Sequence, residues 1–194
     1  MKKITTNMIA GCAVLTALEI ILQIIGNYVA IGPVNINLSL LPICIGAIIY
    51  GPLAGLFLGA VNGCMVLASP STIAVFMPIT VIGTVLTCLL KGMLSGLIAG
   101  LLFLPFRNKN KTIGSVISSL SVPLINTGLF VGFSLIFFQP FLEKGAEGFP
   151  NKYAFLFLGV IGWNFIFEFL VAAILTPVII KIVNIVVKNT GDGI

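Results

Sequence analysis

The amino-acid sequence predicts an all-α membrane protein, a six-transmembrane-helix bundle with both termini cytoplasmic. Hydrophobic residues make up 59% of the 194-residue chain and charged residues only 8%, and the mean hydropathy is +1.22. Soluble domains carry about 25% charged residues, which they need in order to face water. The apolar residues also fall into long runs, separated by short polar or Gly-Pro segments. This pattern is typical of helices that cross a membrane.

The apolar runs divide into six predicted spans that form a single transmembrane domain over residues 1–194. A helix needs about 20 apolar residues to cross a bilayer core of about 30 Å. The first run follows Lys2 and Lys3, and no signal-peptide cleavage pattern lies behind it, so we interpret it as a retained span. The predicted spans are residues 8–25, 38–50, 53–68, 76–106, 113–138 and 153–180.

The second and third spans are short, and Tyr50-Gly51-Pro52 separates them. Proline disfavours the α conformation in the residue before it and cannot donate a backbone hydrogen bond, so Gly-Pro is a strong helix breaker. The alternative is one long kinked span, which gives five spans in all. We favour two spans, because a combined run of about 30 residues is long for a single crossing.

Charged residues are distributed unevenly between the predicted loops. With six spans, the N-terminus, the basic segment 107–111 and the C-terminal segment lie on one side. The loops near residues 26–37 and 69–75, on the other side, carry no charge, and the charges in segment 143–152 balance. The positive-inside rule therefore predicts cytoplasmic termini. Loop charge also explains the net charge of +5, since no basic patch with interleaved aromatic residues indicates a nucleic-acid partner.

Several kinds of chemistry lack their residues in this chain. There is no histidine, and the four cysteines lie in separate apolar stretches without metal-ligand spacing. Ser-His-Asp and Cys-His catalysis and the usual histidine-based metal sites are therefore excluded. The sequence contains no Walker A motif for nucleotide binding. We expect neither a metal nor a cofactor.

Small residues recur every three or four positions in three predicted spans. This spacing lets helix backbones approach closely in lipid, and for the glycines of two of these spans a compact bundle is a full explanation. In the first span the stripe is Ala10, Ala13 and Ala17, for which packing within the chain and contact with another subunit are both open. In the other two spans the recurring residues are Gly55, Gly59, Gly63, Gly92, Gly96 and Gly100.

Three charged residues, Glu19, Lys91 and Glu168, lie inside predicted spans. A charge at membrane depth costs roughly 2.5–3.5 kcal/mol on insertion scales and is by default a functional-site hypothesis. From the helical rise, Lys91 and Glu168 lie roughly 22 Å below the starts of their spans. Mutual pairing and contact with a ligand are both open for these two residues. Glu19 has no evident partner, although Gln23 is one helical turn away.

Neutral polar residues complete a candidate binding site. Trp163 and Asn164 lie about one turn before the buried glutamate of the last span, and Asn126 interrupts the apolar run of the fifth. In the first outer loop, Asn35 and Asn37 alternate with apolar residues, as in a short strand. Uncharged amide and hydroxyl groups suit the wall or lid of a site for a polar small molecule. For any one of these residues, a polar loop in water is the alternative explanation.

Three features together resemble a known family. They are the stripe of Ala13 and Ala17, the segment from Leu40 to Ile43, and the segment from Gly46 to Gly55 around the Gly-Pro turn. They resemble the substrate-binding S-component of an energy-coupling factor (ECF) transporter, a bacterial vitamin importer of the ATP-binding-cassette class. The resemblance covers essentially the whole chain. Its nearest general similarity is to the riboflavin-transporter-like group, with folate, pantothenate or another heterocyclic precursor as alternative substrates.

The resemblance implies a non-enzymatic subunit of the bacterial cytoplasmic membrane. It implies that a vitamin binds near the outer face, and that a transmembrane coupling subunit with two ATPase subunits drives its release inside. In this family the small-residue surface of the first helix, here Ala10, Ala13 and Ala17, packs on the coupling subunit. The implied substrate-binding residues are Asn35, Asn37, Lys91, Asn126, Trp163, Asn164 and Glu168.

Two other function classes remain open from the sequence. One is a stand-alone carrier or channel, which would move its solute without ATP. The other is a small integral-membrane enzyme with Glu168 or Glu19 as general base. No second carboxylate lies near either glutamate in the sequence, and no cofactor motif is present, which disfavours the enzyme.

Overall fold

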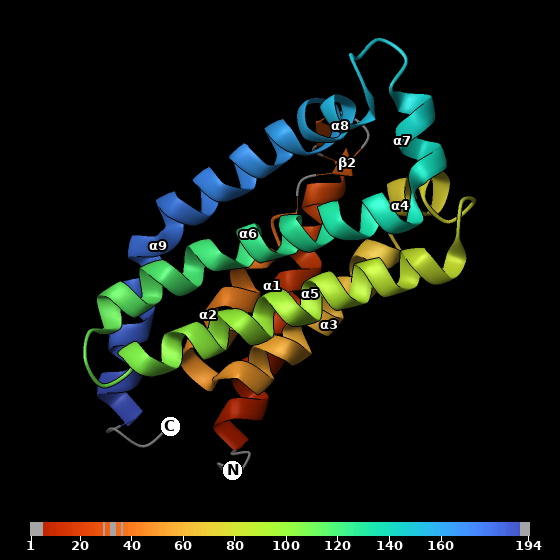
Figure 1. Cartoon of the computed structure of the whole chain (residues 1–194). Coiled ribbons are helices and arrows are strands. Elements are labelled where there is room, and N and C mark those ends of the chain that lie inside the picture. The colour runs from red at the N-terminus through yellow and green to blue at the C-terminus, as the bar shows by residue number, and fades with distance from the viewer. Residues whose placement is uncertain (1–5, 29, 32–33, 36, 191–194) are drawn as a thin grey trace.

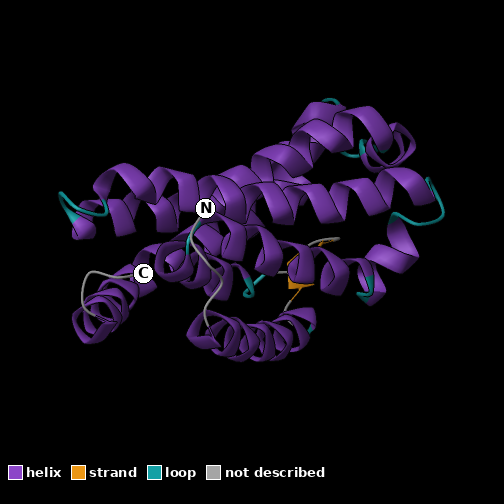
Figure 2. Ribbon diagram, turned by 90° about the horizontal axis from the view of Figure 1, so that it is seen from below, coloured by secondary structure: helices purple, strands orange, loops and turns teal. Residues whose placement is uncertain are grey.

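The protein is helical almost throughout. The computed structural model describes residues 6–28, 30–31, 34–35 and 37–190. The exception to the helical structure is a pair of two-residue antiparallel strands, β1 (Ala30–Ile31) and β2 (Val34–Asn35). Figure 2 shows these strands as one small patch in a molecule otherwise made of helices. The predicted all-α class is confirmed, and the strand expected around Asn35 is present as β2.

Four helical segments of the described chain are long and apolar enough to cross a membrane. The first is α1 (Thr6–Asn27), and the second is α5 (Val81–Phe103) continued by the 3-10 turn η1 (Leu104–Phe106). The third is α6 (Lys111–Phe137). The fourth runs through α8 (Lys152–Ala154) and the π-helix η2 (Phe155–Gly162) into α9 (Trp163–Thr190). Each of these segments overlaps one of the longer predicted spans.

Two shorter apolar helices, α2 (Leu40–Tyr50) and α3 (Pro52–Leu67), occupy the second and third predicted spans. Gly51 separates them with a φ of 98°, a left-handed conformation that glycine adopts without steric cost. Pro52 then occupies the first position of α3, where its missing N–H leaves no hydrogen bond unmade. The predicted break at the Gly-Pro turn is therefore confirmed. Whether α2 and α3 each cross the bilayer stays a prediction.

The fourth predicted span begins too early. Residues 76–80 are not part of the long helix, and α5 begins at Val81. The Thr80 side chain accepts a hydrogen bond from the Gly83 N–H at 3.2 Å and so caps the helix. A separate short helix, α4 (Pro70–Val75), precedes this turn.

The closest helix contact lies between α3 and α5, and we call it the α3–α5 seam. Here the Gly55, Gly59 and Gly63 ridge of α3 faces the Gly92, Gly96 and Gly100 ridge of α5 and its flanking backbone. A Cβ atom built on Gly59 would clash with the carbonyl oxygen of Gly92, and one on Gly92 would clash with that of Gly59. The predicted close approach of small-residue ridges is confirmed.

The two ends of the bundle are formed by different elements. Figure 1 shows the start of α1 and the end of α9 at one end, and α4, β2 and α7 (Gln139–Gly145) at the other. Two chain ends at the same end of a bundle are consistent with an even number of crossings. The basic residues Lys2 and Lys3, used for the orientation, lie outside the described residues, and the orientation stays a prediction.

Candidate ligand-binding site

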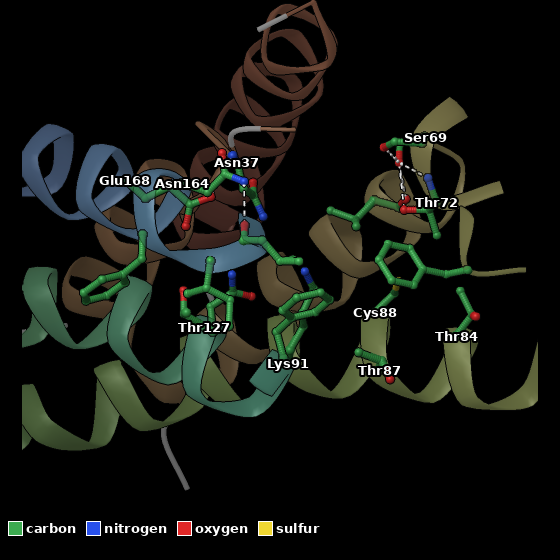
Figure 3. Close-up of a pocket in the computed structure, with 18 of the residues that line it drawn as sticks. Asn37, Ser69, Thr72, Thr84, Thr87, Cys88, Lys91, Thr127, Asn164 and Glu168 are labelled. Carbon is green, nitrogen blue, oxygen red and sulfur yellow. Dashed lines mark hydrogen bonds between the residues drawn. The ribbon is translucent and has the colours of Figure 1, made fainter. Parts of the chain in front are cut away.

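A pocket lies towards the end of the bundle that carries α4 and α7. It contains about 780 Å³ of empty space, part of which is open solvent. Its walls come from α1, α3, α4, α5, α6, η2, α9 and the segment before α2. In Figure 3, the α5 side chains lie opposite Asn37, Asn164 and Glu168, and Ser69 and Thr72 lie on a further side. Segments far apart in the sequence therefore meet around one space.

The α5 wall consists of Thr84, Thr87, Cys88 and Lys91. Their spacing of three and four residues places all four side chains on one face of the helix. The hydroxyls of Thr84 and Thr87 each donate to the backbone carbonyl four residues earlier, at 2.7 Å. The methyl groups and the thiol make most of this wall apolar, and Lys91 supplies its charge.

Lys91 is 9% exposed, and its Nζ lies 5.3 Å from the centroid of the Phe130 ring. A cation at this distance from an aromatic face is attracted by the negative centre of the ring. Lys91 and Glu168 both line the pocket, but no salt bridge joins them in the described structure. The salt bridge found among the described residues joins Lys152 Nζ and Glu143 Oε1 at 3.9 Å. Direct pairing of Lys91 with Glu168 is therefore not what this structure shows.

Glu168 holds the segment that precedes α2 against α9. The backbone N–H of Asn37 donates to Glu168 Oε1 at 2.9 Å, across 131 residues of sequence. A hydrogen bond from a backbone N–H to a carboxylate is charge-assisted and stronger than one between neutral groups. This contact brings together two of the predicted site residues.

The Asn37 side chain belongs to a buried amide and hydroxyl cluster. Asn37 Nδ2 donates to Asn62 Oδ1 at 3.3 Å, and Asn62 Nδ2 donates to Asn37 Oδ1 at 3.2 Å. Asn62 Nδ2 also donates to Ser39 Oγ. The Ser39 hydroxyl lies 2.8 Å from Gln23 Oε1 and 2.6 Å from Asn37 Oδ1, and it can give its one proton to either. The cluster joins α1, α3 and the segment between β2 and α2 beside the pocket.

Two further asparagines line the pocket from α6 and α9. Asn126 is 4% exposed, and its Oδ1 accepts no hydrogen bond from any described residue. A buried carbonyl oxygen without a donor costs about 1–3 kcal/mol, so its presence calls for an explanation. Asn164 is also buried, and its Nδ2 donates to the Val160 carbonyl at 3.0 Å. Val160 lies in the π-helix η2, and π-helical segments are often found at functional sites.

Phenylalanine rings form the apolar part of the pocket. Phe76 lies at the end of α4, before the turn that leads into α5. Its ring centroid is 6.0 Å from that of Phe130 and 4.9 Å from that of Phe138. Phe165 lines the pocket from α9. Such rings offer flat surfaces for a ring or hydrocarbon body of a ligand.

Two of the predicted site residues are not shown at the pocket. Trp163 is 69% exposed and does not line it. Consecutive residues of a helix point in directions about 100° apart, so the turn that aims Asn164 inward aims Trp163 outward. Asn35 lies in β2, and its side chain lies outside the described part of the structure. The structure thus brings together Asn37, Lys91, Asn126, Asn164 and Glu168.

Sequence reasoning missed several lining residues. Among them are Gln23, Thr84 and Thr87, whereas Ser69 and Thr72, which also line the pocket, belong to the uncharged outer loop that was expected as a wall or lid. The spacing of the two threonines relative to Lys91, four and seven residues, was the available signal, since it places them on the lysine face of one helix. Asn62 does not line the pocket but bonds Asn37 beside it. Its signal in the sequence is that it is the one amide residue in the apolar run of α3.

Glu19, the third buried charge, lies apart from the pocket. Its side chain is fully buried, and neither carboxylate oxygen has a hydrogen-bond partner among the described residues. The hydroxyl of Thr16, one turn earlier, is also buried without a partner in that part of the chain. Glu19 does not line the pocket.

The outer face of α1 is apolar and uncovered in the isolated chain. Ala10, Ala13 and Ala17 are exposed. Val14 and Ile21 on the same helix are 69% and 55% exposed. The alanine stripe does not serve packing within the described chain, which leaves a subunit contact or lipid as its environment.

The fold and the pocket define a multi-pass helical membrane protein with a pocket lined by polar and aromatic side chains. The family model "ECF transporter, substrate-specific component" matches residues 7–180. The chain therefore belongs to the family of substrate-specific components of ECF transporters, and it is a transport protein. No curated protein and no solved structure gives a match.

Proposed function

We propose that this subunit captures a vitamin or related small heterocyclic molecule at the outer face of the membrane. An ATP-driven coupling module, made of a transmembrane coupling subunit and two ATPase subunits, then drives delivery to the inside. The observation that carries the proposal is the pocket, where the Lys91 ammonium and the Asn126 carbonyl, both without a hydrogen-bond partner among the described residues, face one space beside phenylalanine rings. Buried polar groups without partners at a cavity are the expected state of a site that awaits its ligand.

The proposed membrane arrangement is a single domain of six spans with both termini in the cytoplasm of a bacterial cell. It is supported by the four long apolar helices, the two shorter ones, and the loop charges. In this orientation α4 and α7 lie outside, and the pocket is nearer the outer face. A cysteine-accessibility scan at positions 71 and 109 tests the orientation, because they are on opposite sides of the membrane in this proposal.

The proposed substrate-binding residues are Asn37, Lys91, Asn126, Asn164 and Glu168. The support is that all five line the pocket. Asn35 belongs to the proposal only as part of the strand pair that leads into Asn37.

The proposed contact with the coupling subunit is the α1 surface formed by Ala10, Ala13 and Ala17. Small exposed residues let a second helix approach closely, and their neighbours Val14 and Ile21 offer apolar area. Replacing Ala13 with Trp should abolish copurification with the coupling module and leave ligand binding unchanged.

Reconstitution in proteoliposomes tests the proposed function. Riboflavin, folate and pantothenate are the first substrates to examine. We expect ATP-dependent uptake only when the coupling module is present, and a bound ligand in native mass spectrometry of the subunit alone. Uptake by the subunit alone without ATP would instead establish a carrier or channel, and chemical conversion of the bound molecule would establish an enzyme.

A further inference from the structure

The two charged residues of the pocket, Lys91 and Glu168, differ in their polar partners within the protein. The Glu168 carboxylate accepts the Asn37 N–H at 2.9 Å, so the protein itself supplies a polar partner for its negative charge. The Lys91 ammonium has three N–H donors, and within the described residues it forms neither a hydrogen bond nor a salt bridge. Its close polar contact is with the face of the Phe130 ring. Two opposite charges therefore line one pocket, but of the two only the ammonium lacks a hydrogen-bond partner among the described residues.

A buried ammonium in this position is costly when its donors have no acceptor, even with Glu168 elsewhere in the same pocket. Lys91 is 9% exposed, lies in the middle of α5, and is surrounded by apolar helix. Burial of an unpaired ammonium removes most of its hydration, and one aromatic face replaces only part of it. Of the described residues that line the pocket, Lys91 is also the one basic residue. A single negative group on a ligand would match it.

Two other polar residues of the pocket, Asn126 and Glu168, offer hydrogen-bond acceptors. Asn126 Oδ1 is a buried acceptor without a donor, so it fits an N–H or O–H group of a ligand. Glu168 has accepted one hydrogen bond and, as a carboxylate, has capacity for more. Phe76, Phe130 and Phe138 line the same pocket, and their rings suit a flat or hydrocarbon body.

We infer that the substrate is a small organic monoanion of the carboxylic-acid class. Its carboxylate lies against Lys91, its body lies between the phenylalanine rings, and an N–H or O–H group of the same molecule donates to Asn126. This inference rests on the proposed function of the pocket as the substrate site. It disfavours cationic vitamins, because a second positive charge beside Lys91 would be repelled, and it disfavours neutral ones, because they bring no charged acceptor to the donors of the Lys91 ammonium.

Matched pairs of acid and neutral analogue test the inference on the unaltered protein. Purified full-length protein in nanodiscs is titrated calorimetrically with pantothenate and pantothenol, nicotinate and nicotinamide, and biotin and its primary amide, with riboflavin as a neutral planar probe. We expect at least one acid to bind, and its neutral partner to bind about 30-fold more weakly or worse, since leaving one member of a buried charge pair unmatched is costly. Equal affinity within a pair that binds would overturn the inference, as would binding of riboflavin alone.

Variants at position 91 test the assigned contact. Lys91→Met should weaken binding of the preferred acid about 30-fold or more and narrow its preference over the neutral analogue, whereas Lys91→Arg should keep that preference. Lys152→Met is the control, because it removes a lysine whose Nζ bonds Gln139 and Glu143 outside the pocket. Thermal unfolding shows whether each variant is folded. An unchanged acid preference in a folded Lys91→Met protein would overturn the contact.

Failure of the inference is distinguishable from failure of the proposed function. If native mass spectrometry finds a copurified ligand, its formula gives its charge directly. An acid supports the inference, and a neutral or cationic ligand overturns it while the binding function stands. If no probe binds and no ligand copurifies, the proposed function itself is overturned, and the inference falls with it.

Discussion

One face of α5 packs closely against a neighbouring helix, and another face of the same helix lines a pocket. On one face, Gly92, Gly96 and Gly100 bring α5 against the backbone of α3. A Cβ atom on any of these glycines would clash with α3. On the other face, Thr84, Thr87, Cys88 and Lys91 border a pocket. One helix therefore belongs both to a closely packed contact between helices and to the wall of a pocket.

This difference shows how a bundle in lipid can keep a cavity. Helices in a membrane are not driven together by hydrophobic burial, so close packing must be obtained through small residues and van der Waals contact. The α3–α5 seam supplies that contact and fixes the position of the α5 wall. On the pocket side, α4 and α6 meet through the rings of Phe76 and Phe130, which line the pocket together with the α5 residues. The α3–α5 seam thus holds in place the helix whose side chains line the pocket.

The largest expected effect comes from breaking the seam. Gly59→Val places a branched side chain against the Gly92 carbonyl and the Met93 backbone, and the two helices must separate. We expect the free energy of unfolding to fall by about 3 kcal/mol, at the upper end of overpacking effects, or the protein to fail to fold. Thermal unfolding in detergent measures this. Gly128→Val on α6 is the matched control, because a Cβ at Gly128 meets nothing within 4 Å. Equal stability of the two variants would contradict the importance of the seam.

The second prediction concerns the amide cluster that supports the pocket from behind. Asn62→Leu removes the donor to Asn37 Oδ1 and to Ser39 Oγ, and it leaves the Asn37 amide without its reciprocal partner. We expect a loss of about 1–3 kcal/mol in stability. Hydrogen exchange should be faster at the Asn37 N–H, because its bond to Glu168 depends on the position of this segment. Exchange at Asn37 that stays as slow as in the wild type would show that the Glu168 contact alone holds the segment.

The sequence was sufficient for the features that follow from local rules. The helix break at Gly51, the two glycine ridges and the membrane class each depend on residue type and spacing, and each is confirmed. The meeting of Asn37 with Glu168 was not derivable in this way, because it joins residues 131 positions apart through a segment without regular structure. Trp163 was assigned to the site because it adjoins Asn164, and the helical turn places it on the opposite side. Ser69 and Thr72 were expected only as part of an uncharged outer loop suited to a wall or lid, and the packing of α4 across the pocket makes them lining residues.

The third prediction separates a ligand contact from a structural one. Asn126→Leu removes an amide oxygen that has no donor in the described structure. We expect stability to stay unchanged or to rise by up to about 1 kcal/mol, because an unsatisfied buried acceptor is lost. Affinity for the preferred acid should fall about tenfold, which corresponds to one hydrogen bond of about 1.4 kcal/mol. This is the reverse of Asn62→Leu, which costs stability first. A stability loss of similar size in both variants would show that Asn126 has a structural partner.

The smallest expected effect concerns Glu19, which lies neither at the seam nor at the pocket. Its carboxyl group is fully buried, and both oxygens lack partners among the described residues, so no contact seen there stabilises a negative charge. Glu19→Gln keeps the shape and removes the possibility of ionisation. We expect a melting temperature equal to or slightly above that of the wild type, since an unpaired buried carboxylate is more costly than a neutral amide. Binding of the preferred acid should not change, because Glu19 does not line the pocket.

Glu19→Asp is a useful companion variant, because it keeps the carboxyl group and shortens the side chain. If Glu19→Gln were destabilised while Glu19→Asp were not, a cation or a donor must meet the carboxylate, and α1 would be a third kind of region beside the packed seam and the open pocket.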